Sequence, residues 1–147
     1  MYKFCVFAGT TEGRELVEFL AGQEDVSVTA CVATDYGEAL LPPAENLTVS
    51  ARRMTAEEMA DLLAGEKFDL VVDATHPYAR EVSANIRSAC RSAGVPLRRL
   101  LRRESQLPPG RIFAGSPEEA AQFLQSREGN IPLAIGAQGL SAFSGLD

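Results

Sequence analysis

The sequence predicts an α/β protein built on a doubly wound, mostly parallel sheet with helices on both faces. Short apolar runs alternate with stretches of helical periodicity along all 147 residues. This alternation is typical of β-α-β units that form a parallel sheet. Polar or glycine-rich segments directly follow several of the runs, and in open sheets of this class ligands bind where the strands end.

Six apolar runs predict the strands, because each run is short and is bounded by turn-forming or polar residues. They span residues 2–8, 26–33, 46–50, 68–74, 96–101 and 131–135. Arginine pairs interrupt the pattern of the fifth run. The expected sheet therefore has six strands.

Helical patterns fill the intervals between these runs. Three residues after the first strand have the i, i+3, i+4 spacing of one helix face, namely Leu16, Phe19 and Leu20. Thr55 and Glu58 form a capping box, in which each side chain accepts from the backbone N–H of the other residue. We expect the helix that starts there to end at Gly65, since glycine is common just past a helix.

Two further helices are expected later in the chain. One follows the fourth strand and stops near Gly94, and its inner face is formed by Tyr78, Val82, Ile86, Ala89 and Cys90. The other starts at a second capping box, Ser116 and Glu119, with Pro117 at its first helical position. Phe123 is expected to face inward on this helix.

The composition is that of an ordinary globular protein, with 46% hydrophobic and 23% charged residues. No apolar run approaches the roughly 18 residues of a membrane span, and the N-terminus lacks a signal-peptide layout. We therefore expect a cytoplasmic location and no membrane partner. We also expect one domain over residues 1–147, with residues 104–115 as the most linker-like stretch. The sequence does not indicate an oligomeric state.

The cysteines Cys5, Cys31 and Cys90 are scattered and show no C-x-x-C spacing. This pattern disfavours both a disulfide framework and a zinc site. We expect three small buried thiols and no bound metal.

The net charge of −6 hides an asymmetry along the chain. Residues 1–86 carry 15 acidic and 6 basic side chains, whereas residues 87–147 carry 5 acidic and 8 basic ones. One acid-free stretch holds a cluster of arginines, which are Arg87, Arg91, Arg98, Arg99, Arg102 and Arg103. An acidic protein with such a cluster is a poor general binder of nucleic acid, but it can bind a small polyanion. A solvated helix face and an edge strand explain the same arginines.

A segment rich in glycine and threonine, Gly9-Thr10-Thr11-Glu12-Gly13-Arg14, joins the first strand to the first helix. Glycines let backbone N–H groups approach a phosphate closely, and the helix N-terminus favours negative charge. The spacing is G-x-x-x-G rather than the G-x-G-x-x-G of dinucleotide-binding proteins. The alternative is a tight turn with a threonine cap, so the phosphate-binding hypothesis depends mainly on position.

The segment Thr34-Asp35-Tyr36-Gly37 follows the second strand, where folds of this class distinguish NAD from NADP. Asp35 favours NAD, since an acidic side chain there accepts a hydrogen bond from the ribose 2′-hydroxyl. Thr34 and the nearby Arg52 or Arg53 favour NADP. An ordinary polar loop also explains the segment.

Polar residues also follow the fourth strand, in Asp73-Ala74-Thr75-His76-Pro77-Tyr78. Pro77 suits the start of a helix, which places Thr75 or His76 near its N-cap. His76 is the only histidine and can donate to a substrate, shuttle a proton or cap the helix. Tyr78 is either a core residue or a phenol directed at the cleft. The absence of other histidines, of paired cysteines and of a G-x-S-x-G motif disfavours metallohydrolase and serine-hydrolase chemistry.

Together these segments resemble the precorrin-6A reductase family, which includes the cobalt-precorrin-6A reductases. The resemblance rests on residues 8–14, 33–37, 69–85 and 136–147, and the third segment is the most specific. It implies a Rossmann-like fold and an NADPH-dependent reductase of cobalamin biosynthesis that transfers hydride to C19 of precorrin-6A and reduces the C18–C19 double bond. Family members are longer and continue with a second α/β domain, so we expect this chain to be the N-terminal domain.

The resemblance also implies roles for individual residues. The implied cofactor-binding residues are Gly9, Thr10, Thr11, Glu12, Gly13, Arg14, Thr34, Asp35, Gly37 and Arg53. The implied catalytic residues are His76 and Tyr78. A proton must also reach C18, and its donor is one of His76, Tyr78 and Asp147, a residue of the second domain, or water. The residues expected to contact the tetrapyrrole substrate are Thr75, Pro77 and Arg80, and the many acidic groups of that substrate suit the arginine cluster.

Two other functions compete with this hypothesis. A non-catalytic Rossmann-type dinucleotide-sensing module would use the same first loop, but it would have no use for the polar segment after the fourth strand. A short-chain dehydrogenase is disfavoured because the Tyr-x-x-x-Lys pair is absent, Lys3 and Lys67 being the only lysines. The sequence departs from the family at Ala137 and Gln138, where relatives often have a hydroxyl and a basic residue.

Overall fold

A computed structural model describes residues 1–103 and 109–146. The chain forms two compact units, Met1–Arg103 and Glu104–Asp147, and each is described by itself. Part of the linker-like stretch, residues 104–108, lies outside the described residues. The expectation of a single domain over residues 1–147 stays a prediction.

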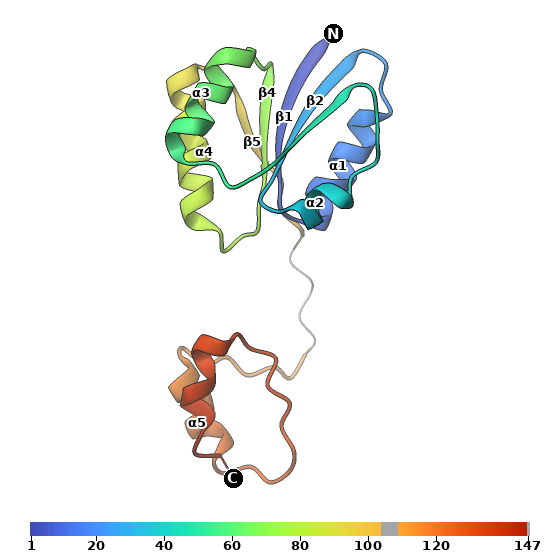
Figure 1. The fold of residues 1–147 in the computed structure, drawn as a ribbon. Helices are drawn as coiled ribbons and strands as arrows, with labels where there is room; N and C mark the ends of the chain where they lie inside the picture. The colour runs from blue at the N-terminus through green and yellow to red at the C-terminus, as the bar shows by residue number, and fades with distance from the viewer. Residues whose placement is uncertain (104–108, 147) are drawn as a thin grey trace. The chain divides into compact units, whose positions relative to one another are not determined.

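The first unit contains a parallel sheet with the strand order β3-β2-β1-β4-β5 (Figure 1). The strands are β1 (Tyr2–Ala8), β2 (Val26–Val32), β3 (Leu47–Ala51), β4 (Leu70–Ala74) and β5 (Leu97–Arg99). In the central strand β1, Val6 lies opposite Ala30 of β2 on one side and Val72 of β4 on the other. The predicted doubly wound parallel sheet is confirmed, because the chain builds outward from β1 to β3 and then returns to add β4 and β5.

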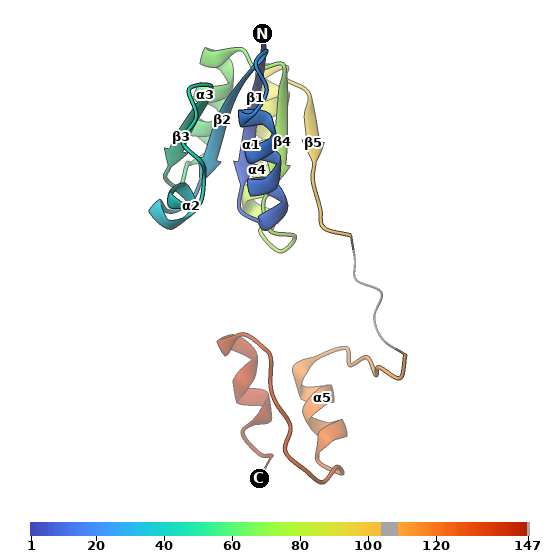
Figure 2. The same cartoon turned by 90° about the vertical axis from the view of Figure 1, so that its right-hand side faces the viewer.

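Helices cover both faces of this sheet (Figure 1 and Figure 2). They are α1 (Thr11–Ala21), α2 (Asp35–Ala39), α3 (Ala56–Glu66) and α4 (Arg80–Ala93). α1 and α2 lie on one face, while α3 and α4 pack side by side on the other. Right-handed crossovers explain this, since strands added on opposite sides of β1 place their helices on opposite faces. No helix in the described part of the chain is both long and apolar enough to cross a bilayer.

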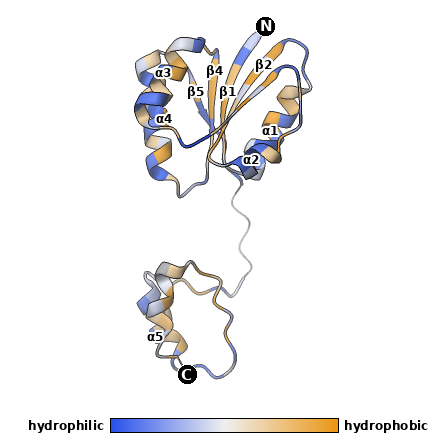
Figure 3. Cartoon of the chain, in the orientation of Figure 1, coloured by the Kyte–Doolittle hydropathy of each residue, from blue (hydrophilic) through white to orange (hydrophobic). Residues whose placement is uncertain are grey.

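Each face of the sheet has its own buried core, because successive strand residues point to opposite faces. In β1, Cys5 and Phe7 pack into the core that includes α3 and α4, whereas Val6 and Ala8 pack into the core that includes α1. Figure 3 shows β1, β2 and β4 as largely hydrophobic. Burial on both faces explains why these strands appear in the sequence as continuous apolar runs.

The buried face of α1 differs from the predicted one. Phe19 is 65% exposed, and Val17 is buried with 0% exposure. Gly13, Val17 and Leu20 form the buried positions of the helix, and they also have helical spacing. The helix buries the face that contains Gly13, because a residue without a side chain lets the helix approach the sheet closely.

The prediction that Gly65 ends α3 is wrong. The helix continues to Glu66 and is capped by Lys67, whose φ is 51°. A left-handed conformation costs a residue with a side chain about 1 kcal/mol. The next residue, Phe68, is buried at 7% exposure, and its burial offsets that cost. The predicted capping box of Thr55 and Glu58 is confirmed, with hydrogen bonds of 3.2 and 2.7 Å.

All three cysteines are buried and free, as predicted. The Sγ atoms of Cys5 and Cys31 lie 3.9 Å apart. Their hydrogen bond, and then burial, raise the pKa of the Cys5 thiol, and burial raises the pKa of Cys90. Thiols in such surroundings are poor nucleophiles, so these two act as small hydrophobic residues.

The second unit contains α5 (Pro117–Leu124) and a short 3₁₀ helix, η1 (Ala137–Phe143). Half of the predicted capping box forms: Ser116 accepts from the N–H of Glu119 at 3.1 Å, but the Glu119 carboxylate accepts from the N–H of Gly115 at 2.7 Å rather than from Ser116. Phe123 is 39% exposed rather than inward-facing. The predicted sixth strand is wrong, because residues 131–135 form no strand. An apolar run becomes a strand only where another strand supplies hydrogen-bond partners, and residues 109–146 contain no other strand.

Candidate functional site

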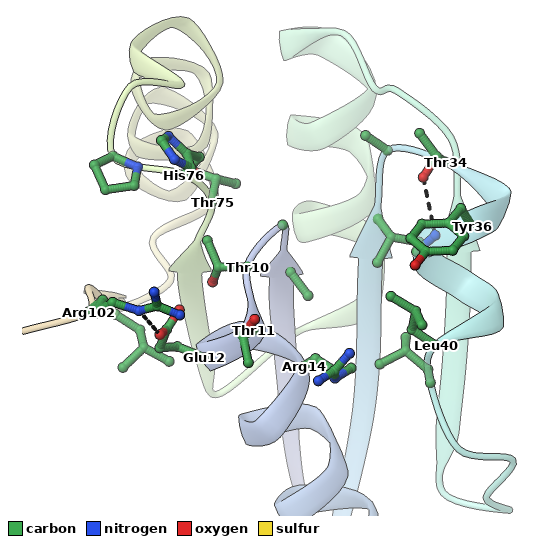
Figure 4. Close-up of a pocket in the computed structure, with 18 of the residues that line it drawn as sticks. Thr10, Thr11, Glu12, Arg14, Thr34, Tyr36, Leu40, Thr75, His76 and Arg102 are labelled. Atoms are coloured by element: carbon green, nitrogen blue, oxygen red, sulfur yellow. Dashed lines mark hydrogen bonds and ion pairs between the residues drawn. The ribbon is translucent and has the colours of Figure 1, made fainter. Parts of the chain in front are cut away.

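A cavity of about 580 Å³ opens at the carboxyl edge of the sheet in the first unit (Figure 4). Its lining residues come from segments that follow four of the parallel strands, within residues 8–14, 32–41, 75–77 and 100–102. Its volume lies within the range of about 300–1,000 Å³ that is typical of small-molecule sites. Three of these segments are the ones that the sequence singled out, and parallel strands bring them together because their carboxyl ends share one edge.

The turn after β1 is held against the end of β4 by Thr10. Its Oγ1 accepts from the N–H of Gly13 at 3.2 Å and donates to the carbonyl oxygen of Ala74 at 2.8 Å. The hydroxyl hydrogen of Thr10 is therefore used within the protein. Thr11 is exposed on the cavity wall, so of these two threonines it is the one whose hydroxyl is available to a ligand.

The two glycines of this turn have different roles. A Cβ on Gly13 would lie 2.9 Å from the Cβ of Ala74 and 3.1 Å from the Cα of Ala8. Gly13 is therefore required for close packing of α1 on the sheet, and it does not line the cavity. A Cβ on Gly9 would have its nearest contact, the Cα of Thr75, at an ordinary 3.5 Å. The fold therefore has room for a side chain at Gly9. Such a side chain would, however, block a ligand that approaches the backbone at this position.

An ion pair crosses one end of the cavity. The Nε of Arg102 donates to Oε1 of Glu12 at 2.6 Å. The hydrogen bond from Arg102 holds the pKa of the Glu12 carboxyl below its usual range, and Glu12 raises the pKa of Arg102. From the sequence, Arg102 was expected only as a member of the arginine cluster at residues 87–103. The two residues lie far apart in sequence, so no local pattern indicates their contact.

The segment after β2 contains the short helix α2, which was not predicted. Thr34 caps it by accepting from the N–H of Gly37 at 3.1 Å. Three apolar or aromatic side chains of this region also line the cavity, namely Tyr36, Leu40 and Leu41. Leu40 caps α2 and Leu41 lies beyond it, so no helical spacing in the sequence could have identified the three together.

Two of the residues considered for the choice between NAD and NADP do not line the cavity. Asp35 and Arg53 are absent from its wall, although Thr34 and Gly37 are present. Arg52 instead pairs with Glu58, with Nη1 and Oε1 2.5 Å apart. Arg14 lies on the wall.

A buried carboxylate organises the segment after β4. Asp73 is 2% exposed, and its Oδ1 accepts from Arg99 at 2.6 Å and from the hydroxyl of Thr75 at 2.6 Å. Arg99 also donates to the carbonyl oxygens of Asp73 at 3.0 Å and of His76 at 3.4 Å. Arg99, expected as part of a binding cluster, therefore fixes the loop that carries Thr75 and His76.

His76 lines the cavity, and its Nδ1 accepts from the backbone N–H of Tyr78 at 3.2 Å. In the neutral ring one nitrogen accepts and the other donates, so the proton is on Nε2. The expected N-cap role of Thr75 or His76 is wrong, because α4 begins at Arg80 with Ala79 as its cap. The carbonyl oxygen of His76 accepts from the N–H of Ala79 at 2.9 Å, and this tight turn delays the helix.

The remaining predicted residues lie in different places. Pro77 lines the cavity, whereas Tyr78 and Arg80 do not. Tyr78 is 83% exposed rather than in the core, with its ring centroid 5.2 Å from that of His76. Asp147 lies outside the described residues. Across residues 1–103 and 109–146, no group of three or more His, Cys, Asp or Glu side chains is arranged to hold a metal ion.

Comparisons with known proteins agree with the family resemblance that the sequence indicated. A family model described as precorrin-6x reductase CbiJ/CobK matches residues 3–147. The chain is 30% identical over 136 residues to the cobalt-precorrin-6A reductase of Methanothermobacter thermautotrophicus, covering 92% of this chain and 45% of that protein. It is 30% identical over 148 residues to the precorrin-6A reductase of Rhodococcus erythropolis, covering 99% and 59% of the two chains.

Among solved structures, CobK precorrin-6A reductase matches with a TM-score of 0.69 and 29% identity, over 97% of this chain and 57% of that one. The chain therefore spans about half the length of the relatives that it matches.

Proposed function

The chain belongs to the precorrin-6x reductase CbiJ/CobK family, as the resemblance indicated. From this premise we propose that it binds NADPH for the reduction of precorrin-6A or cobalt-precorrin-6A in cobalamin biosynthesis. The proposal includes the cofactor, the substrate and the residues that serve them. Its expected reaction is hydride transfer to the tetrapyrrole macrocycle.

The observation that best supports the proposal is the position of the cavity, which lies at the carboxyl ends of the neighbouring strands β1 and β4. The winding order of the sheet reverses between these strands, and dinucleotides bind at this switch point in doubly wound folds. In Figure 4 the cavity reaches from Tyr36 on one side to His76 on the other. An extended dinucleotide would place its pyrophosphate at the turn after β1 and its adenosine half toward β2.

The turn after β1 fits a pyrophosphate. α1 is 11 residues long, so the positive end of its dipole favours an anion at the first turn. Gly9 leaves the backbone open on the cavity side, and the exposed hydroxyl of Thr11 can donate to a phosphate oxygen. Arg102 neutralises the carboxylate of Glu12, which would otherwise repel the anion.

The two ends of the cavity differ in chemistry. Tyr36, Leu40 and Leu41 provide an apolar surface suited to the flat face of an adenine. The opposite end is polar and carries His76, so it suits the nicotinamide and the substrate. When bound, NADPH supplies the hydride, and the protein supplies orientation and electrostatics.

His76 is the strongest candidate for contact with the reacting groups. Its Nε2–H is free of the loop contact that occupies Nδ1, so it can donate a hydrogen bond to the substrate or deliver a proton. The network of Asp73 and Arg99 holds the backbone of His76 in place, which limits the entropy lost on ordering it. Tyr78 stays a second candidate from the same turn.

Binding and turnover test the proposal separately. In calorimetric titrations, NADPH should bind the chain more tightly than NADH, and equal or reversed affinities would contradict the assignment. With precorrin-6A and NADPH under anaerobic conditions, a protein of the relatives' full length that carries this domain should consume the cofactor, whereas the 147-residue chain alone is expected to bind NADPH and can be inactive. In the full-length protein, His76→Ala should lower turnover by about a hundredfold or more with little change in melting temperature. A large loss of thermal stability with normal turnover would assign His76 a structural role, and NADPH binding without any turnover by the full-length protein would favour a sensing module.

A further inference from the structure

We propose that Arg14 is the residue that distinguishes NADPH from NADH, by binding the phosphate on the 2′ position of the adenosine ribose. This inference rests on the proposed function, since it concerns one subsite of the proposed dinucleotide site. The family resemblance implies that Arg14 contacts the cofactor, whereas the choice between the two cofactors was expected to depend on other residues.

The charges on the cavity wall point to Arg14. Among the described residues, the carboxylate and guanidinium side chains that line the cavity are Glu12, Arg14 and Arg102. Glu12 and Arg102 form an ion pair of 2.6 Å with each other. Of these three charges, Arg14 is therefore the one that neither of the others neutralises, and an additional phosphate is a group that such a charge suits.

The position of Arg14 fits the adenosine half of the site. It lies three residues after Thr11 on α1, and residues at this spacing share one face of a helix. In Figure 4, Arg14 appears between Thr11 and Leu40, toward the Tyr36 side of the cavity, whereas Arg102 and His76 lie at the opposite end. The 2′-phosphate of a dinucleotide lies at the adenosine end, so Arg14 rather than Arg102 is placed to meet it.

Asp35 and the two arginines that were considered for the choice between NAD and NADP do not line the cavity. Asp35 is the acidic side chain expected to accept from an unmodified ribose, and it does not line the cavity. Arg53 is also absent from the wall, and Arg52 is paired with Glu58 at 2.5 Å. Neither of the arginines considered from the sequence is therefore available at this subsite.

Arg14 is free to change partners. In the described part of the chain its ion-pair partner is Glu18, with Nε and Oε1 3.6 Å apart and both side chains substantially exposed, at 36% and 46%. Exposed pairs of this i, i+4 type contribute little. A guanidinium binds phosphate through two parallel hydrogen bonds, so a 2′-phosphate would replace Glu18 at a net gain.

The test compares two ligands that differ only in the 2′-phosphate. NADPH and NADH are titrated calorimetrically into the wild-type chain and into Arg14→Gln. Arg127→Gln is the matched control, because Arg127 is an exposed arginine that does not line the cavity. Arg14→Gln should weaken NADPH binding by about tenfold or more and change NADH binding by less than about twofold. Arg14→Lys keeps the charge without the planar fork, so its preference should be intermediate. Arg127→Gln should match the wild type.

Several results would overturn the assignment. An equal loss for both ligands in Arg14→Gln would place Arg14 at the pyrophosphate or in a structural role, and an unchanged preference would place the discriminating residue elsewhere. A wild-type preference for NADH that is abolished in Asp35→Asn would transfer the role to Asp35. Circular dichroism checks that each variant is folded, and if Arg14→Gln is not, Arg14→Lys decides the question. If the wild type binds neither dinucleotide, the proposed function itself fails, whereas NADPH binding that is insensitive to Arg14 removes this inference alone.

Discussion

The close packing of Gly13 in α1 against the sheet gives a prediction whose magnitude follows from the structure. In Gly13→Ala, the new Cβ would lie 2.9 Å from the Cβ of Ala74 and 3.1 Å from the Cα of Ala8. Carbon atoms in favourable contact are about 3.5–4.0 Å apart. Ala8 and Ala74 belong to adjacent strands in the middle of the sheet, so neither can move away cheaply, and α1 must shift outward instead.

Two opposing effects determine the size of the change. Overpacking of a well-packed core costs about 1–3 kcal/mol. Alanine is a better helix former than glycine by about 0.5–1 kcal/mol. The expected net result is a loss of up to about 2.5 kcal/mol with a central value near 1 kcal/mol, and each kcal/mol lowers the melting temperature by roughly 4–8 °C for a unit of this size.

Gly65→Ala is the matched control, because it makes the same change in α3, where a new Cβ has nothing within 4 Å. Only the helix-propensity effect applies there, so Gly65→Ala should stabilise the protein by about 0.5–1 kcal/mol. Urea unfolding followed by circular dichroism measures both variants. The reasoning is refuted if Gly13→Ala is as stable as Gly65→Ala, since that would mean that α1 has room to move.

The remaining predictions concern a buried ion pair and an exposed cap. Asp73→Ala should lower the free energy of unfolding by about 3 kcal/mol, because it leaves Arg99 without its partner. This is the low end of the cost of breaking a buried ion pair, since 29% of the Arg99 side chain is exposed. A loss below about 1 kcal/mol in urea unfolding would contradict the network around Asp73. Glu58 has a lowered pKa, chiefly because it accepts from the backbone N–H of Thr55. Its stabilising effect should therefore be present above its ordinary pKa of 4.5 and disappear as the pH falls through the lower, folded-state value. The stability difference between the wild type and Glu58→Gln should shrink over this acidic range, and a difference independent of pH would argue against the cap.

Much of the fold was predictable because its signals are local. The capping residues Thr55 and Ser116 act on N–H groups three residues away, so the sequence around them is sufficient to locate α3 and α5. Strands buried on both faces appear as uninterrupted apolar runs, which is why the strands of the sheet were found. The apolar run at residues 131–135 failed, because a strand is defined by a partner strand and not by its own composition.

The candidate site, like the fold, was predictable only in part. The carboxyl edges of parallel strands meet, so the alternation of strands and helices already places the segments near Gly9, Thr34 and His76 on one side of the sheet. The identity of the contacts within the site could not be predicted in this manner. Asp73 and Arg99 are separated by 26 positions, and Glu12 and Arg102 by 90.

The sequence by itself determined the fold class, the family and the three segments that surround the cavity. Each of these depends on periodicity and on residues close together along the chain. Only the tertiary structure decided which arginines are committed to internal partners, which threonine hydroxyl faces the cavity, and that Arg14 rather than Arg53 lies on its wall. Those choices depend on the distances between side chains from separate strands and helices, and such distances exist only after the sheet has assembled.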